Sequence, residues 1–502
     1  MSFKVHIKTY GCQMNERDSE MIAVLLQHHG YALAERESQA DAVIVNTCSV
    51  RAKAEDKAIG KLRMLISARQ EHPDRIVGVV GCMVQRLKDD LFRQVPGLDF
   101  AVGTHVLARV PAILAAVLAQ KLSDPGYAGG FADSPSRSAM AERGVRAHTA
   151  GRAGLPGVVP ISRKAGTQPG HRPILDVASA DDPYDGHTHL PGEISAFVNI
   201  LFGCDRHCAY CVVPEVRGGE WSRPAKDVIE EVRQLVAQGV KEITLLGQSI
   251  MAYGRQTHVW ETTDRSPRGF TEPLPRLLEA LNDIPGLYRL RFTSGHPCGC
   301  TAELARAFAE LPAVCEHLHL PLQSASDRIL QLMNRGYTAA DYRAAVRRLQ
   351  EAMPRIVLTT DVIVGFPTET PEEFDMTRAF LEEIGFDNVY IFKYNPRPGT
   401  PAAQWSDDVS AKEKLRRNHA LLEDQGKRSQ AFHQAFTGQA CEVLVEGPSL
   451  RNEARWAGRT RHNILAVFEA VPGLKAGDLV TLRVAQATAQ ALYGTIERKT
   501  AG

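Results

Sequence analysis

The chain has 502 residues, of which 44% are hydrophobic, and its formal net charge is +1. A chain of this length predicts about three cored domains of ~150 residues each. The balanced charge excludes a uniformly basic protein, so any surface for nucleic acid must be local. We expect no membrane span and a cytoplasmic location, because no long apolar run occurs and the first twenty residues hold no apolar signal core. Ten cysteines in so long a chain exclude a disulfide scaffold, and their clustering points to metal binding or catalysis.

Strand-like and helical segments alternate through residues 1–122. We expect strands at 3–10, 40–47, 75–81 and early in 98–120, and helices at 16–29, 51–70 and late in 98–120. This alternation predicts an α/β domain with a parallel sheet. Residues 123–190 then hold 10 Gly and 7 Pro without any periodicity, which predicts a flexible linker or insertion.

The strand and helix alternation resumes at 191 and continues to 435. We expect strands at 194–201, 241–246, 288–293, 317–322, 356–364 and 388–394, with helices such as 225–237, 301–310 and 339–352 between them. Six such units predict a partial (β/α) barrel. The tail, 436–502, alternates apolar and polar residues between Gly and Pro turns, which predicts a small antiparallel β-barrel. A helix at about 409–434 joins the barrel to this tail.

The sequence FGCDRHCAYC places three cysteines in a C-x3-C-x2-C loop directly after a predicted strand: Cys204, Cys208 and Cys211. Three thiolates on one short loop suit an iron–sulfur cubane, and they leave the fourth iron open. An open iron can chelate S-adenosylmethionine and pass an electron to its sulfonium. The alternative is a structural zinc loop, but zinc takes four ligands and only His207 lies within the loop.

A second set of three cysteines is spread over the first domain, as Cys12, Cys48 and Cys82. Each follows one of the first three predicted strands. Because the carboxyl ends of parallel strands line one edge of a sheet, we expect these thiols to converge on a second cluster. The alternative is three buried core cysteines.

The remaining cysteines, Cys298, Cys300, Cys315 and Cys441, are interpreted as ordinary residues, although Cys298 and Cys300 could form a redox-sensitive pair. Polar residues follow several barrel strands, where barrel sites lie. The candidate contacts to S-adenosylmethionine are Gln248, Ser294, Gln323, Ser324, Asp361 and Gly365, the last because glycine lets the chain pass close to a ligand. The tail has four clustered arginines that suit RNA phosphates, Arg451, Arg455, Arg459 and Arg461, but a solvated charged rim would look the same.

Taken together, these residues resemble the radical S-adenosylmethionine methylthiotransferases over nearly the whole chain except 123–190. The tail looks like a TRAM RNA-binding domain. Four stretches look like the branch of the family that acts on N6-dimethylallyladenosine in tRNA: GCQMN (11–15), NTCSVRAKAEDK (46–57), LPLQSASDRILQLMNRGYT (320–338) and GRTRHN (458–463). At the first stretch the ribosomal-protein branch usually reads GCPKN and the threonylcarbamoyladenosine branch GCKVN. The chain departs from the family in its longer linker, in HPCGC (296–300) and in QSAS (323–326), and none of these is a cluster cysteine.

The resemblance implies two 4Fe-4S clusters and S-adenosylmethionine as cofactors, with no side chain needed as a catalytic base. The cluster at Cys204, Cys208 and Cys211 would generate a 5′-deoxyadenosyl radical that removes hydrogen from C2 of N6-dimethylallyladenosine at position 37 of tRNA. The cluster at the N-terminal cysteines would carry or deliver sulfur, and a second S-adenosylmethionine would supply the methyl group. The expected partners are that tRNA and an external flavodoxin- or ferredoxin-like electron donor, with the protein a monomer.

Two other functions stay open at this point. The same chemistry could act on another substrate, namely a threonylcarbamoyladenosine tRNA or a ribosomal protein. The chain could instead be a non-enzymatic iron–sulfur electron carrier with an RNA-binding tail. Formation of 5′-deoxyadenosine would separate an enzyme from a carrier.

Overall fold

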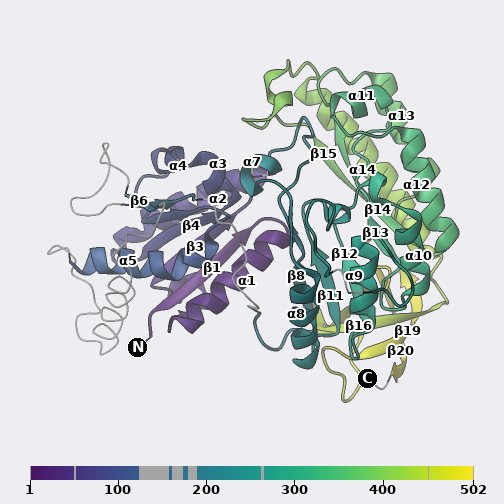
Figure 1. Ribbon diagram of the computed structural model, residues 1–502, viewed down its shortest axis with the longest axis horizontal. Helices are drawn as coiled ribbons and strands as arrows, with labels where there is room; N and C mark the ends of the chain where they lie inside the picture. The colour runs from purple at the N-terminus through teal and green to yellow at the C-terminus, as the bar shows by residue number, and fades with distance from the viewer. Residues whose placement is uncertain are drawn as a thin grey trace. The chain divides into compact units, whose positions relative to one another are not determined.

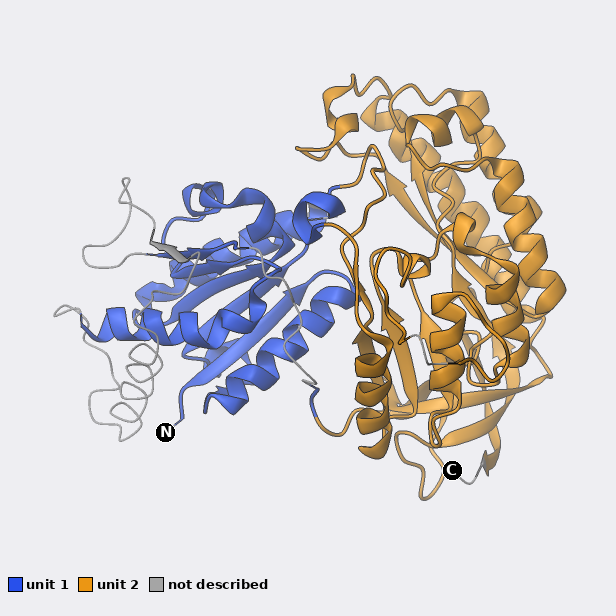
Figure 2. Cartoon of the chain, viewed as in Figure 1, with its two compact units in different colours: residues 1–190, 212–218 blue, residues 191–211, 219–502 orange. Residues whose placement is uncertain are grey.

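The computed structural model describes residues 2–49, 52–123, 158–160, 173–178, 189–261, 265–449 and 452–500. The chain divides into two compact units, residues 1–190 with 212–218, and residues 191–211 with 219–502 (Figure 2). The short stretch 212–218 therefore belongs to the first unit, although the chain on both sides of it belongs to the second.

The first unit is built on one seven-stranded sheet with the order β2-β1-β3-β4-β5-β7-β6. Its strands are β1 (Lys4–Tyr10), β2 (Ala32–Leu33), β3 (Ala42–Thr47), β4 (Ile76–Gly81), β5 (Phe100–Val102), β6 (Val158–Pro160) and β7 (Ile174–Asp176). All neighbours are parallel except β6 and β7. Every residue of β3 and β4 is buried, as expected for central strands that are covered on both faces.

Helices cover both faces of this sheet (Figure 1). They are α1 (Gln13–His28), α2 (Ala52–Ser67), α3 (Cys82–Leu87), α4 (Asp89–Gln94) and α5 (Val110–Leu122). One apolar layer joins α1 and α5 to the sheet, and the other joins α2, α3 and α4 to its opposite face. The predicted parallel α/β domain is confirmed, and strand follows helix in the predicted order.

Part of the predicted linker is folded. Strands β6 and β7 fall inside 123–190 and extend the N-terminal sheet, with β7 parallel to β5. Asp176, at the end of β7, is fully buried and accepts a hydrogen bond from Arg109 at 3.2 Å. The run ILD is too short to show a period between Gly- and Pro-rich neighbours, so composition alone conceals it. Most of the remaining linker lies outside the described residues.

The second unit contains an open barrel made of two three-stranded parallel sheets, β12-β11-β8 and β13-β14-β15. These strands are β8 (Ser195–Asn199), β11 (Glu242–Leu246), β12 (Arg289–Phe292), β13 (His317–His319), β14 (Val357–Val364) and β15 (Asn388–Lys393). A parallel bridge between Leu290 and Val314 connects the two sheets. Within the described residues β8 and β15 do not pair, so the barrel has two free edges. The predicted partial (β/α) barrel is confirmed.

Six helices pack outside the barrel strands, and they and the strands share one large apolar core. The helices are α8 (Ala225–Ala237), α9 (Pro273–Asn282), α10 (Ala302–Glu310), α11 (Asp327–Leu332), α12 (Ala339–Ala352) and α13 (Pro371–Ile384). Outward residues of the strands, such as Ile243, Leu290 and Val362, enter this core. The alternate residues of each strand face the barrel interior.

The tail forms a closed five-stranded barrel with the order β16-β17-β18-β20-β19, as predicted. It follows α14 (Ala411–Gln434) and consists of β16 (Ala440–Ser449), β17 (Asn452–Thr460), β18 (Leu465–Glu469), β19 (Leu479–Ala487) and β20 (Ala491–Thr500). All of its pairs are antiparallel except β18 with β20. A small apolar core fills this barrel.

Buried arginines join the tail to the (β/α) barrel. Arg291 on β12 is 6% exposed and donates to Glu242 at 3.0 Å and to the carbonyls of Thr460 and Arg461 at 2.9 and 2.8 Å. Arg289, which is fully buried, donates to the Arg459 carbonyl at 2.7 Å. Because these donors satisfy backbone carbonyls of the tail, the two barrels pack as one unit.

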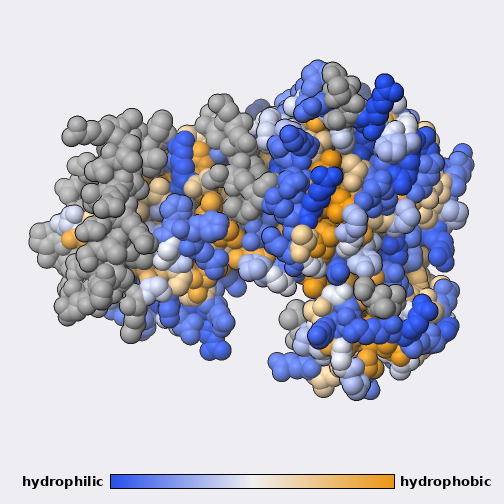
Figure 3. Space-filling model, turned by 60° about the horizontal axis from the view of Figure 1, so that its bottom comes forward, coloured by the Kyte–Doolittle hydropathy of each residue, from blue (hydrophilic) through white to orange (hydrophobic). Residues whose placement is uncertain are grey.

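Hydrophilic side chains cover most of the described surface of the second unit in the view of Figure 3, and they interrupt its apolar patches. Among the helices that the structure describes, none has the length and apolar composition needed to cross a membrane.

We predict that Arg291→Met will destabilise the protein by about 3–5 kcal/mol, because Glu242 then stays buried without its guanidinium and two tail carbonyls lose a donor. Urea unfolding measures this change. Lys427→Met is the control, since Lys427 forms only an exposed pair with Glu423 and its removal should leave the unfolding midpoint unchanged. Equal midpoints for the two variants would show that the buried arginine does not hold the tail.

Candidate functional site

The strand register brings the three N-terminal cysteines together. Tyr10 at the end of β1 pairs with Thr47 at the end of β3, and Thr47 pairs with Gly81 at the end of β4. Cys48 and Cys82 each follow directly on these paired ends, and Cys12 comes one residue further along. The thiols of Cys12 and Cys48 are within hydrogen-bond reach of each other. All three therefore lie at one edge of the sheet, as expected from their spacing.

The backbone around the cysteines is fixed by local structure. Cys12 is the N-cap of α1, and its N–H donates to Asn15 Oδ1 at 3.2 Å. Asn15 and Asn46 are both buried and exchange two hydrogen bonds, at 3.1 and 2.8 Å. Gly81, with φ +101, turns the chain directly before Cys82, and a Cβ there would lie 2.5 Å from the Thr47 carbonyl oxygen. Only glycine can make this turn without strain.

The electrostatics of this edge differ between its thiols and favour thiolate at Cys12. The hydrogen bond with Cys48 lowers the pKa of Cys12 to about 6, against the opposing effect of burial. Burial raises the pKa of Cys82. The charge of the nearby Arg217 guanidinium opposes this shift without cancelling it. Thiolate is the form that binds metal, so Cys12 is ready to ligate near neutral pH.

Arg217 lies on the short helix α7 (Val213–Arg217), which belongs to the same unit as these cysteines. Its guanidinium donates to Asp18 at 2.6 Å, and both side chains are buried. Val212 and Val216 of the same stretch pack against Cys82. A buried cation is thus placed beside the three thiols, and the sequence motifs did not reveal it because it lies about 200 residues away from Asp18.

The other three cysteines lie on one loop after β9 (Leu201–Phe202), which pairs with β10 (Trp221–Ser222). Cys204 and Cys208 are buried and Cys211 is half-buried. The segment after α11 holds the loop, because Ala209 donates to the Met333 carbonyl at 3.0 Å and Asn334 donates to the His207 carbonyl at 2.8 Å.

Two arginines accompany this loop. Arg335 is 7% exposed and its Nη1 lies 3.1 Å from Cys208 Sγ, while Arg206 donates to the Ser249 hydroxyl at 3.2 Å. Arg206 Nη1 also lies 3.2 Å from His296 Nε2. Burial, followed by the charges of Arg335 and Arg206, lowers the pKa of His296 to about 2, so this imidazole is neutral. The sequence analysis did not single out either arginine, because the motif identifies only the cysteines that could bind iron.

Thiolates are soft ligands that suit iron–sulfur clusters, and structural zinc needs four ligands. In the parts of the chain that the structure describes, no three His, Cys, Asp or Glu side chains are arranged to hold one metal ion. His207, the only candidate fourth zinc ligand in the loop, is exposed.

The six expected contacts to S-adenosylmethionine fall into different environments. Ser294 and Gln323 adopt left-handed backbone angles, with φ 62 and 72, a strain that often marks a binding site. The Oε1 atom of Gln248 is buried and has no partner among the described residues, and the Oδ1 atom of Asn199 at the end of β8 is in the same state. These two amide oxygens are available to a ligand's N–H groups. The sequence analysis did not single out Asn199.

The other three residues have internal partners. Ser324 is fully buried and its hydroxyl lies 3.4 Å from that of Thr377 on α13. Asp361 Oδ2 lies 3.3 Å from His319 Nε2, on the inner face of β14. Gly365 has φ +67, and a Cβ there would meet Lys414 Cγ at 2.3 Å, so glycine makes room for α14.

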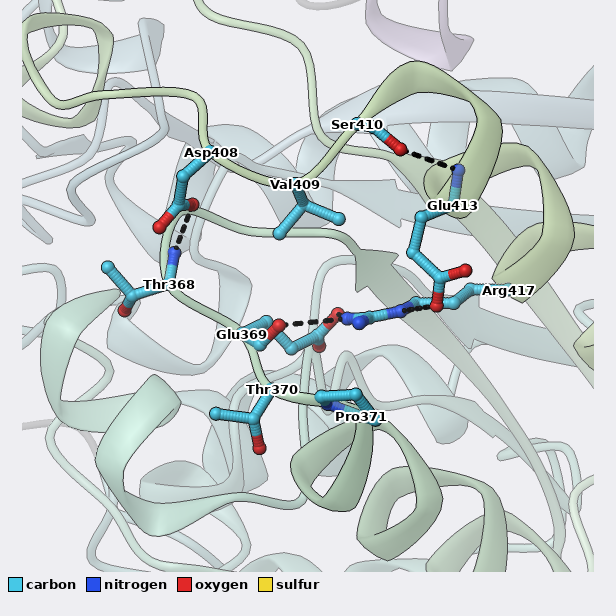
Figure 4. Close-up of a pocket in the computed structure, with 9 residues that line it drawn as sticks. All are labelled: Thr368, Glu369, Thr370, Pro371, Asp408, Val409, Ser410, Glu413 and Arg417. Carbon is cyan, nitrogen blue, oxygen red and sulfur yellow. Dashed lines mark hydrogen bonds and ion pairs between the residues drawn. The ribbon is translucent and has the colours of Figure 1, made fainter.

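A hollow of about 400 Å3 adjoins the loop after β14 (Figure 4). Its centre is the buried ion pair of Glu369 with Arg417 at 2.6 Å, and Arg417 also donates to Glu413 at 2.8 Å. Glu369 accepts from the Gly365 N–H at 2.6 Å. Glu369 therefore connects the loop after β14 to α14, because it bonds to both Gly365 and Arg417. The sequence motifs did not single out Glu369.

The remaining cysteines are scattered. Cys300 and Cys315 are buried, and burial raises the pKa of Cys300 to about 12, which makes its thiol unreactive. Cys298 is exposed and Cys441 is half-buried.

The tail arginines are used in different ways. Arg455 on β17 is exposed, and Arg459 is half-exposed and pairs with Glu446 at 3.2 Å. Arg461 instead donates to Glu316 at 2.8 Å and to the carbonyls of Pro312 and Val314, so it helps to dock the tail. Arg451 lies outside the described residues. Of the predicted RNA contacts, Arg455 is the best placed to meet a phosphate.

Known families match three parts of the chain. "Uncharacterized protein family UPF0004" matches residues 4–103, the radical SAM superfamily residues 198–381, and the TRAM domain residues 434–496. The tRNA-2-methylthio-N(6)-dimethylallyladenosine synthase of Akkermansia muciniphila is 40% identical over 98% of this chain and 98% of its own length. The enzyme of that name from Opitutus terrae is also 40% identical, over 98% of this chain and 97% of its own.

Solved structures share the fold. The radical S-adenosylmethionine methyltransferase TsrM from Kitasatospora setae superposes with a TM-score of 0.52 and 16% identity, covering 80% of this chain and 74% of that chain. At this identity the likeness supports the arrangement of strands and helices alone.

We predict that Gly81→Ala will impair metal binding by the N-terminal cysteines. The positive φ costs about 1–3 kcal/mol for alanine, and the contact with the Thr47 carbonyl displaces Cys82. Iron retained after reconstitution and urea unfolding would both report the loss. Gly60→Ala in α2 is the matched control, because its Cβ meets nothing within 4 Å and should stabilise the helix by about 1 kcal/mol. Full iron binding in the Gly81 variant would contradict the role of this turn.

Proposed function

Because the chain belongs to the family of tRNA-2-methylthio-N(6)-dimethylallyladenosine synthases, we propose that it adds a methylthio group to C2 of N6-dimethylallyladenosine at position 37 of tRNA. The reaction is a transfer of a sulfur-containing group by radical S-adenosylmethionine chemistry. The observation that carries the proposal is that two separate sets of three cysteines are each gathered on one edge or one loop, beside a buried arginine.

Each set of three thiols has the donor chemistry of a 4Fe-4S cluster with one open iron. Cys12, Cys48 and Cys82 hold one cluster in the first unit. The C-x3-C-x2-C loop holds the other in the second unit, with Cys204 as its first ligand. The cluster on this loop would supply the electron for reductive cleavage of S-adenosylmethionine, and the cluster in the first unit would supply sulfur.

The protein's own residues hold and orient S-adenosylmethionine. Gln248 and Asn199 offer acceptors to its N–H groups, and the turns at Ser294 and Gln323 present backbone to the barrel mouth. Glu220 lies near Asp205 and Cys204, and burial raises its pKa. A carboxylate beside the cluster loop is well placed to attract the ammonium group of methionine.

The buried arginines offset negative charge. Three thiolates in an apolar pocket disfavour one another, and a guanidinium nearby lowers that cost. Arg217 serves the first set and Arg335 the second. No carboxylate is required as a base at C2, because radical chemistry would remove the C2 hydrogen as an atom and not as a proton.

The tail barrel binds the tRNA backbone, with Arg455 as one contact. An external flavodoxin- or ferredoxin-like protein supplies electrons, and the protein acts as a cytoplasmic monomer. These assignments follow from the kind of chemistry proposed, and they are separate from the assignment of the clusters.

Mass spectrometry of tRNA nucleosides from cells that lack this protein tests the function. We expect N6-dimethylallyladenosine to accumulate and its 2-methylthio derivative to disappear, and both changes to reverse when the intact gene is restored. Normal methylthio levels on tRNA, with a loss on another tRNA nucleoside or on a ribosomal protein, would redirect the substrate assignment.

We predict that Cys204→Ala abolishes 5′-deoxyadenosine formation, whereas Cys48→Ala leaves it and stops methylthiolation. The reason is that the two cysteines belong to different sets in different units. An assay with reductant, S-adenosylmethionine and modified tRNA measures both products. Methylthio product at the wild-type rate from Cys48→Ala would reduce the N-terminal set to a structural role.

We predict that Arg455→Ala lowers the slope of log K against log salt for tRNA binding by about one unit, because one phosphate contact is lost. Arg461→Ala should leave the slope unchanged and lower thermal stability, since this side chain bonds to the (β/α) barrel. Filter binding across a salt series distinguishes the two. The reverse pattern would mean that Arg461 faces the RNA.

A further inference from the structure

Four side chains form what we call the inner patch, on the barrel face turned away from the helices: His319, Thr359, Asp361 and Tyr390. In the strand register His319 pairs with Thr359, and Asp361 pairs with Tyr390, so each pair points to the same side of the sheet. The residues that alternate with them, Leu318, Val362 and Val389, are buried in the apolar core beneath the helices. The inner patch therefore lines the barrel interior.

Contacts within the inner patch fix its geometry. His319 lies with Nδ1 3.0 Å from Thr359 Oγ1 and with Nε2 3.3 Å from Asp361 Oδ2. The rings of His319 and Tyr390 meet edge to face, with centroids 5.7 Å apart and planes at 72°. His319 thus orients both the carboxylate and the tyrosine ring.

The inner patch leaves binding capacity unused. Tyr390 is 47% exposed although it lies on the inner face. Within the described residues, its hydroxyl makes no hydrogen bond and the Asp361 carboxylate has no partner except His319. An open aromatic face next to a fixed acceptor suits a planar heterocycle that carries an N–H group.

We propose that the inner patch binds the adenine ring of the nucleoside to be modified. Tyr390 stacks on the base, Asp361 accepts the hydrogen bond of the N6–H group, and His319 is a positioning residue. This inference rests on the function proposed above and names the residues that recognise its substrate. Aromatic stacking and acceptance from an exocyclic N–H by a carboxylate are both established ways to hold a base.

The surrounding charges favour an uncharged ligand. His317 lies two residues before His319 on the same face of β13 and is half-buried. Its surroundings lower its pKa well below the usual value, first by desolvation and then by the charge of Arg291, so it is neutral. The charge of Arg291 acts on His317, and Arg291 is engaged by Glu242 and two carbonyls. A phosphate would find no available cation at the inner patch, whereas a base needs none.

The depth of the inner patch separates it from S-adenosylmethionine. Asp361 lies four residues before Gly365, which is about 13 Å along a strand at ~3.3 Å per residue. The cysteine loop follows the carboxyl ends of the strands, so S-adenosylmethionine held by a cluster there would begin at the barrel mouth. Tyr390 lies on β15, whose outer edge pairs with no described strand and is contacted by α14, where Asn418 donates to the Ile391 carbonyl at 3.1 Å. The Tyr390 ring itself is 47% exposed, so a base that has swung out of its RNA stack can reach it.

The test uses the full-length reconstituted protein and an anticodon stem-loop RNA that carries N6-dimethylallyladenosine. We expect Tyr390→Ala to raise the KM for this RNA by about 5- to 100-fold, as the loss of one stacked base predicts. Tyr390→Phe should restore most of the affinity because it keeps the ring. Asp361→Leu should raise KM, because the N6–H group of the base loses its acceptor. Tyr288→Ala, a half-buried tyrosine outside the inner patch, should have no effect.

Binding of S-adenosylmethionine and its cleavage without RNA, measured on the same variants, distinguish the two sources of adenine. We expect both to stay within twofold of wild type. A weakened Kd for S-adenosylmethionine with an unchanged KM for RNA would overturn the inference and assign the inner patch to the cofactor. An unchanged KM for both ligands in Tyr390→Ala would overturn it as well. If the wild-type protein forms no methylthio product on this RNA, the proposed function itself fails, and the inference fails with it.

Discussion

The parallel register of β1, β3 and β4 determines where the first three thiols lie. Tyr10, Thr47 and Gly81 end their strands side by side, so residues placed just after them meet whatever the sequence distance between them. The register fits the packing on both faces of the sheet, because a slip of one residue would exchange side chains between two apolar layers that are packed against different helices. The positions of the three thiols therefore follow from the packing of the core. The two hydrogen bonds between Asn15 and Asn46 fix the backbone beside the thiols.

Charge compensation is the second common feature of the two cysteine sets. Arg217 and Arg335 are both buried and each reaches a cysteine of its own unit. A buried cation is costly alone, and it is stable here because Asp18 pairs with Arg217 and because the thiols carry negative charge when they ligate iron. Residues 212–218 follow Cys211 directly in the sequence and belong to the unit of the N-terminal cysteines. A single stretch of chain thus leaves one set and supplies the cation of the other.

Much of this could be predicted from the sequence. Local sequence patterns predict the strands that are buried on both faces, the cysteines that follow strand ends and the short C-x3-C-x2-C loop. The barrel strands also lie where their sequence patterns predict them. Long-range partners could not be predicted: nothing near Arg461 in sequence shows that it bonds to Glu316, and nothing near Gly365 shows that Lys414 packs against it. The short strand β7 was hidden by its Gly- and Pro-rich neighbours. Ser324 follows the predicted strand 317–322 as a ligand would, yet its hydroxyl faces Thr377 on α13.

The most direct measurement of the two-cluster account is iron and sulfide content with Mössbauer spectra of the reconstituted protein, compared between wild type and variants that lack one whole cysteine set. The account predicts roughly eight irons per chain in wild type and roughly four in each variant, with cubane spectra in both variants. About four irons in wild type, or the loss of all iron when Cys12, Cys48 and Cys82 are replaced, would contradict two independent clusters.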